Sequence, residues 1–117
     1  MDIFEFFKYI FTFAYMNRKE LISKVKESVK SIDMEAQVIL YGSRSRGNEN
    51  SFSDWDFLIL TPNFVDETFK NKIRSKLIDT ELEAEEVIST IIFSNETWNN
   101  LKVTPLYKNI SRDGIRI

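Results

Sequence analysis

Two aspartates separated by one residue, Asp54 and Asp56, are well suited to chemistry in this chain. Residues 55–60 form an apolar run that is typical of a buried strand. Side chains two apart in a strand point to the same face, so both carboxylates should project together. Like charges at this range repel unless a cation lies between them, and oxygen ligands favour hard cations such as Mg²⁺ or Mn²⁺. Two surface aspartates where a strand enters its sheet would, however, give the same short pattern.

A second group of residues lies upstream, where Gly42-Ser43 directly follows the apolar run 36–41. Glycine permits a close approach of the backbone and unusual dihedral angles, and exposed N–H groups at such a turn bind phosphate. The Ser43 hydroxyl can add a hydrogen bond, and Arg44 and Arg46 could pair with phosphates or with an acceptor. Taken alone, these residues would equally suit a basic strand-to-helix turn with solvated arginines.

The composition restricts the chemistry that remains. The chain has neither cysteine nor histidine, which excludes disulfides, zinc-thiolate sites, cysteine nucleophiles and the commonest general base. Its formal net charge is -2, so no global basic field attracts nucleic acid, although a local patch could still bind one. Carboxylates, hydroxyls, lysines and arginines are left to carry any reaction.

The elements that must position these residues follow from the spacing of apolar side chains. Helical spacing predicts helices over residues 17–32 and 66–80, and runs rich in β-branched residues predict strands over 36–41, 55–60 and 86 or 87 to 93. Ser94 to Thr97 resembles a capping box that opens a short helix, and residues 109–117 form a short tail element. This order predicts an α/β (α+β) fold with helices on one face of a sheet, in a single domain.

The strongly apolar segment 1–15 is treated separately. It is too short and too interrupted by charge to span a membrane, and it lacks the basic start and cleavage site of a signal peptide. Three interpretations stay open: a helix packed on the domain or on a partner, a surface-associated amphipathic segment, or an extension upstream of a natural start at Met16. We therefore divide the chain into an N-terminal extension, residues 1–16, and a domain, residues 17–117, and expect a cytoplasmic protein without membrane contact.

Together, the Gly42-Ser43 turn and the aspartate pair indicate a class of protein far more specifically than either group does alone. An apolar strand, Gly42-Ser43, ten intervening residues and then Asp54-Trp55-Asp56 resemble the signature of the nucleotidyltransferase superfamily. The form Gly-Ser-Arg-Ser-Arg-Gly with Ser-Asp-Trp-Asp looks like the minimal nucleotidyltransferases of bacteria and archaea. The resemblance is sharpest over residues 36–60 and extends over residues 17–117.

This resemblance implies a polymerase β-like nucleotidyltransferase core, with a small mixed sheet and helices mainly on one face. Nucleotide-binding residues would be Gly42 and Ser43 with Arg44 and Arg46. Asp54 and Asp56 would be catalytic and would bind Mg²⁺ or Mn²⁺. The reaction would transfer a nucleoside monophosphate, with AMP from ATP the expected case, to a hydroxyl of a protein or small molecule. Many minimal members act as antitoxins beside a HEPN-type protein, so such a partner, or self-association, is expected.

One position departs from the superfamily pattern. The third carboxylate, which commonly serves as the general base, falls at Ser89 when the strand is matched without gaps from Trp98. Glu85 or Glu86 could substitute if the strand is shifted or bulged. Both could equally be solvated residues before the strand. Without a third carboxylate, the alternative is a catalytically silent nucleotidyltransferase fold that acts as a partner-binding module.

Overall fold

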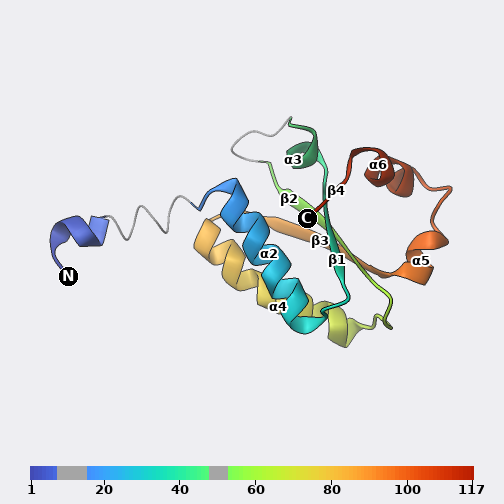
Figure 1. The fold of residues 1–117 in the computed structure, drawn as a ribbon, viewed down its shortest axis with the longest axis horizontal. Coiled ribbons are helices and arrows are strands. Elements are labelled where there is room, and N and C mark those ends of the chain that lie inside the picture. Colours follow the sequence, from blue (N-terminus) through green and yellow to red (C-terminus); the bar gives the residue numbers. More distant parts are fainter. Residues whose placement is uncertain (8–15, 48–52) are drawn as a thin grey trace.

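A computed structural model describes residues 1–7, 16–47 and 53–117 of the chain. Its elements, in chain order, are α2 (Arg18–Ile32), β1 (Gln37–Tyr41), α3 (Ser43–Arg46), β2 (Trp55–Thr61), α4 (Glu67–Ala84), β3 (Ile88–Ser94), α5 (Asn95–Asn99), α6 (Pro105–Asp113) and β4 (Ile115–Arg116). The strands form a four-stranded sheet in the order β3-β2-β1-β4 (Figure 1). Strands β2 and β3 are parallel, and the other pairs are antiparallel. The predicted fold class, a small mixed sheet with helices, is confirmed.

The two long helices, α2 and α4, lie side by side on one face of the sheet (Figure 1). Each begins at a side-chain cap, because Asn17 accepts a hydrogen bond from the Glu20 amide and Asp66 accepts one from the Phe69 amide. The α2 bounds agree closely with the predicted helix, whereas α4 runs beyond residue 80 to Ala84. Glu85 then ends α4 in the left-handed conformation, at φ 52°.

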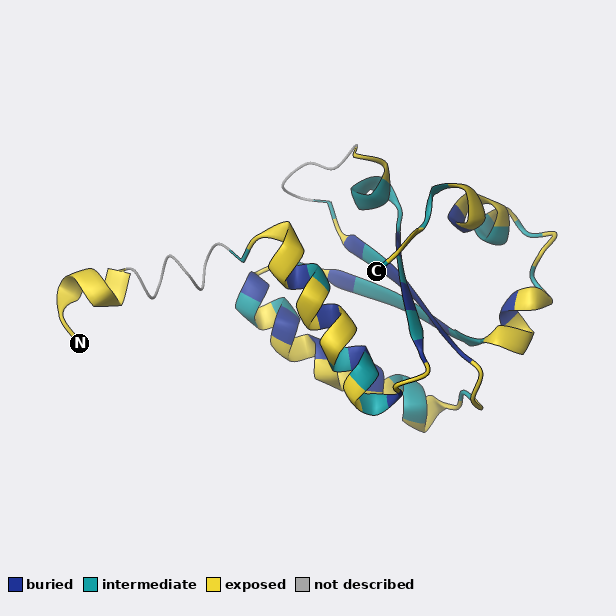
Figure 2. Ribbon diagram, viewed as in Figure 1, coloured by how far each residue is buried: buried dark blue, intermediate teal, exposed yellow. Residues whose placement is uncertain are grey.

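A continuous apolar core lies between these helices and the sheet. Alternate strand residues face it, such as Val38 and Leu40 of β1 and Phe57 and Ile59 of β2. The buried side of each helix and the centre of the sheet meet along this layer (Figure 2). The helices contribute residues at helical spacing: Leu21, Val25 and Val29 from α2, and Ile73, Leu77 and Ala84 from α4.

The opposite face of the sheet is covered in part by the short helices α5 and α6. Ser94 caps α5 by accepting a hydrogen bond from the Thr97 amide at 3.1 Å, as the capping-box pattern predicts. The smaller core on this face joins Leu58 and Leu60 of β2 with Trp98 of α5 and Ile110 of α6. Helices therefore cover both faces, with the long pair on one side and the short pair on the other.

The C-terminal tail contains more structure than the sequence patterns predict. Residues 105–113 form α6, and the two residues of β4 pair with β1 at Ile39 and Leu40. Both β4 residues are exposed, so no alternation of apolar and polar side chains marks this strand in the sequence. The strand β4 forms because its two residues pair with β1.

The N-terminal segment is described only in part. Residues 3–7 are helical, and the side chains of Ile3, Phe4, Phe6 and Phe7 are exposed. The rest of the apolar segment, residues 8–15, lies outside the described residues, as do residues 48–52 of the predicted loop. Within the described ranges, no helix is both long and apolar enough to cross a membrane.

A buried carboxylate joins the end of α2 to the end of β2. Asp33 is 9% exposed and accepts hydrogen bonds from the Thr61 hydroxyl, the Asn63 amide group and the Glu35 backbone amide. Burial alone would raise the pKa of Asp33, but these hydrogen bonds and the nearby Lys30 charge lower that pKa below its ordinary value. The charged form therefore stabilises the fold.

Asp33→Asn should lower the free energy of unfolding by about 1–3 kcal/mol at neutral pH, because charge-assisted hydrogen bonds are lost. Since folding lowers the pKa of Asp33, its contribution is present above the ordinary value of about 3.9 and is lost as the pH falls through the lower folded value. Urea unfolding at pH 7 and pH 3 measures both effects. The exposed Asp79→Asn is the matched control, and equal losses in the two variants would contradict this role.

Candidate functional site

The register of the sheet places three polar side chains in one row. Tyr41 of β1 lies opposite Asp56 of β2, and Asp56 lies opposite Ser89 of β3. Residues paired across neighbouring strands share a face. This face also carries Leu58 and Leu60, so it is the side that α5 and α6 cover in part. The row lies at the end of the sheet where β1 leads into α3.

The charges of Asp54 and Asp56 are coupled. Asp54 is exposed just before β2, and Asp56 is partly buried within the strand. Burial raises the pKa of Asp56, the Asp54 charge raises it further, and the Arg46 charge lowers it. A second positive charge between the two carboxylates would relieve this repulsion, so the pair is suited to a divalent cation.

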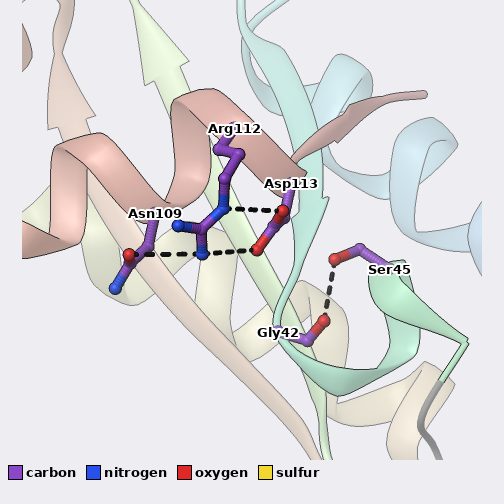
Figure 3. Close-up of polar contacts among 5 residues, drawn as sticks. All are labelled: Gly42, Ser45, Asn109, Arg112 and Asp113. Carbon is purple, nitrogen blue, oxygen red and sulfur yellow. Dashed lines mark hydrogen bonds and ion pairs between the residues drawn. The ribbon is translucent and has the colours of Figure 1, made fainter.

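Gly42 brings the turn after β1 against the Asp56 carboxylate. Its φ of 77° is a left-handed conformation that favours glycine, and a Cβ built there would lie 2.5 Å from Asp56 Oδ2. The Ser45 hydroxyl donates to the Gly42 carbonyl oxygen at 2.7 Å, which closes the turn (Figure 3). Ser43 is the first residue of α3, where backbone amides have no partner within the helix. The predicted phosphate-binding turn and the predicted metal ligands therefore meet directly.

The two arginines of the turn have different surroundings. Arg46 is exposed, and its positive charge acts on both Asp56 and Asp113. The Arg44 side chain is only 11% exposed. Its guanidinium donates to the Ser53 carbonyl oxygen and lies over the ring of Trp55. Arg46 is thus near the carboxylates, whereas Arg44 is engaged with the chain that leads into β2.

Polar side chains at the end of α6 border the same turn, a feature that the sequence patterns did not indicate. Arg112 donates to both carboxylate oxygens of Asp113, each at 3.0 Å, and its guanidinium also contacts Asn109 at 3.5 Å. Figure 3 draws this group in one view with Gly42 and Ser45. The Arg112 guanidinium lowers the pKa of Asp113 most strongly, and Arg46 adds to the effect. The site is therefore bordered by α6 as well as by α3.

A hydroxyl, that of Ser89, stands where the resemblance would put a third carboxylate. Ser89 lies in register with Asp56, where the gapless match placed it. Glu86 instead pairs with Arg44 at 3.5 Å, and Glu85 is the exposed cap of α4. In the described ranges, no three acidic, histidine or cysteine residues gather as a metal-binding group. The two aspartates still fit Mg²⁺, which proteins commonly bind through one or two carboxylates plus substrate phosphates.

Tyr41 is the hydroxyl opposite Asp56 on the other neighbouring strand. Burial raises the pKa of Tyr41 to about 12, and the Asp56 charge contributes to the increase. The phenol therefore stays protonated at neutral pH. It can donate a hydrogen bond, but it is a poor base for removing a proton from an acceptor.

Comparison with known proteins agrees with this geometry. Residues 22–117 match the nucleotidyltransferase domain family. Because this match covers most of the chain, the protein belongs to that family, and the prediction of a minimal nucleotidyltransferase is confirmed. The family sets nucleotidyl transfer as the class of activity. A comparison with curated protein sequences gave no match.

Solved structures share the fold at low sequence identity. A toxin–antitoxin complex with AMP-PNP is 16% identical over 86% of this chain and 72% of its own, with a TM-score of 0.58. A protein assigned as a nucleotidyltransferase is 23% identical over 82% of this chain and 96% of its own, also at 0.58. A mutant of the toxin–antitoxin complex MntA-HpeT is 15% identical over 86% and 72%, at 0.56. At these identities the likeness supports the fold.

Gly42→Ala should weaken the binding of ATP with Mg²⁺ on the order of tenfold or more, because the added Cβ would displace the Asp56 carboxylate. The control is Gly47→Ala, since Gly47 also has a positive φ, 75°, but no described residue beyond its chain neighbours lies within 4 Å of its Cβ position. Gly47→Ala should lose about 1–2 kcal/mol of stability from its left-handed backbone, and Gly42→Ala should lose more, because its ψ of -160° is essentially restricted to glycine. Calorimetric titration with ATP and Mg²⁺ measures the difference. Equal losses of affinity would show that backbone strain, rather than the close approach, matters.

Proposed function

We propose that this protein is a metal-dependent nucleotidyltransferase that moves AMP from ATP to a hydroxyl of a partner protein. We place it as the antitoxin half of a toxin–antitoxin pair, with a partner of the HEPN type. The observation that carries the proposal is the approach of the Gly42 turn to Asp56, whose carboxylate also feels the charge of Asp54 just before β2. This joins a phosphate-binding turn to a pair of metal-binding carboxylates.

Several further observations support the proposal. The family match defines nucleotidyl transfer as the class of activity. One structure of similar fold is a toxin–antitoxin complex with AMP-PNP, an ATP analogue, which favours ATP among the triphosphates. Two of the structures with this fold are toxin–antitoxin assemblies, which favours a protein as the acceptor.

In the proposed reaction, an acceptor hydroxyl oxygen forms a bond to the α-phosphorus of ATP. The bond from that phosphorus to the bridging oxygen of pyrophosphate breaks, and the hydroxyl proton passes to solvent or to a group of the acceptor. Asp54 and Asp56 would hold Mg²⁺, which would supply charge neutralisation at the phosphates. Gly42 and Ser43 would position the phosphates, and Arg46 would add positive charge to their other side.

A second candidate function is a catalytically silent partner-binding module. Ser89 favours it, because this hydroxyl lies beside Asp56 where a third carboxylate would serve as general base. Glu86 is paired with Arg44 and Glu85 caps α4, so neither is placed as a substitute. Measured turnover separates the two candidates.

Incubation with ATP, Mg²⁺ and the product of the neighbouring gene should transfer label to protein from α-labelled ATP but not from γ-labelled ATP. Asp54→Asn and Asp56→Asn should each reduce this transfer on the order of a hundredfold or more, because several kcal/mol of charge stabilisation is lost. The exposed Asp79→Asn is the matched control and should transfer as the wild type does. Transfer that survives both site variants would contradict the proposal.

Ser89→Asp distinguishes the two candidates. A carboxylate beside Asp56 would supply a base, and general-base catalysis contributes about 10²–10⁴-fold in rate. We expect the variant to transfer faster than the wild type, with the gain lost again in Asp56→Asn. If the wild type binds ATP without transfer and Ser89→Asp is active, the natural chain is the silent module.

A further inference from the structure

Arg44 connects three segments that must stay in place for the site to work. It belongs to α3, directly after Gly42-Ser43. Its Nε and Nη2 atoms donate to the carbonyl oxygen of Ser53, at 3.2 and 2.8 Å. Ser53 immediately precedes Asp54, so these two hydrogen bonds join the proposed phosphate-binding turn to the residues that lead into β2.

The same guanidinium makes two more contacts beyond the turn. Its central carbon lies 4.5 Å from the centre of the Trp55 ring, a cation–π distance to the residue between the two aspartates. Its Nη2 atom also lies 3.5 Å from a carboxylate oxygen of Glu86, just before β3. One planar side chain thus holds the entrances of β2 and β3 against α3.

The Trp55 ring explains why a guanidinium suits this place. Trp55 is 3% exposed, and its indole N–H has no hydrogen-bond partner among the described residues. Its position depends on packing against Phe57 and on the cations over its ring, Arg44 and Arg18. Since Trp55 lies between Asp54 and Asp56, a shift of this ring would turn both carboxylates.

We propose that Arg44 is a positioning residue that sets the distance and orientation between the Gly42-Ser43 turn and the aspartates, and that it does not bind nucleotide phosphate. The inference rests on the proposed function. It assigns different roles to the two arginines of the turn. Arg44 acts on Asp54 and Asp56 through Ser53 and Trp55, whereas the exposed Arg46 is the arginine available to phosphate.

The test compares Arg44→Lys and Arg44→Met with Arg46→Met. Lysine keeps the charge but cannot donate two hydrogen bonds from a planar group while lying flat on the indole ring. Both Arg44 variants should therefore reduce kcat by tenfold or more, with the KM for ATP changed by less than about threefold. Arg46→Met should instead raise the KM for ATP and make ATP binding less dependent on salt, because a phosphate contact is lost.

Hydrogen exchange of the apo protein tests the connection without nucleotide. The Trp55 amide donates to the Val87 carbonyl oxygen at 2.9 Å, so its exchange reports the junction of β2 and β3. Both Arg44 variants should exchange faster there than the wild type and Arg46→Met, while the amides of α4 keep wild-type protection. Unchanged exchange would overturn the connection, whether or not the protein transfers nucleotide.

Two further outcomes would overturn the positioning role. One is restoration of wild-type kcat by Arg44→Lys, since charge alone would then suffice. The other is a reduced salt dependence of ATP binding in Arg44→Met, since Arg44 would then contact phosphate. A wild type that binds ATP but transfers nothing would contradict only the proposed function. Hydrogen exchange and the salt dependence of ATP binding would still test the role of Arg44, because neither measurement needs transfer.

Discussion

The site depends on one constraint, the repulsion between the Asp54 and Asp56 carboxylates. Asp56 is also packed closely against the turn at Gly42, which has no side chain. The fold partly buries Asp56 next to a like charge, which disfavours its ionised form. Gly42 removes the Cβ that would collide with that carboxylate. Two repelling carboxylates are unfavourable in the free protein, and binding of a divalent cation with nucleotide phosphates would remove this repulsion.

One face of the sheet carries most of the apolar core, and the other carries the candidate site. The long helices α2 and α4 bury the large apolar core of one face, and the Asp33 network connects α2 to the far end of β2. The other face carries Asp56 and Ser89, both partly buried, beyond the small core that α5 and α6 cover. Since β2 belongs to both layers, its alternation places Trp55 and Phe57 in the large core while Asp56 faces the site. A rigid core therefore supports two carboxylates whose mutual repulsion works against folding.

The sequence predicted the elements that carry strong periodicity, and it singled out Gly42 and Asp56, which the fold brings into contact. The spacing of Asp54 and Asp56 predicted neighbouring carboxylates, whose charges are coupled in the fold, and the run before Gly42 predicted the position of the turn. It did not predict β4, because that strand exists only through pairing with β1. Nor did it separate Arg44 from Arg46, since two arginines one residue apart look alike in a sequence until the fold buries one of them. The polar end of α6 was missed for the same reason: the effect of the Arg46 charge on Asp113 depends on the tertiary fold.

The most direct test of the metal site is the thermal stability of the wild type and Asp56→Asn at pH 7, with and without Mg²⁺. Because folding raises the pKa of Asp56, the favourable contribution of its protonated form is present below about pH 3.9 and is lost as the pH rises through the higher folded value. At pH 7 without metal, Asp56→Asn should therefore unfold at a higher temperature than the wild type. Mg²⁺ should raise the unfolding temperature of the wild type and leave that of Asp56→Asn unchanged. A variant less stable than the wild type without metal, or equal shifts with Mg²⁺ in both proteins, would contradict the account.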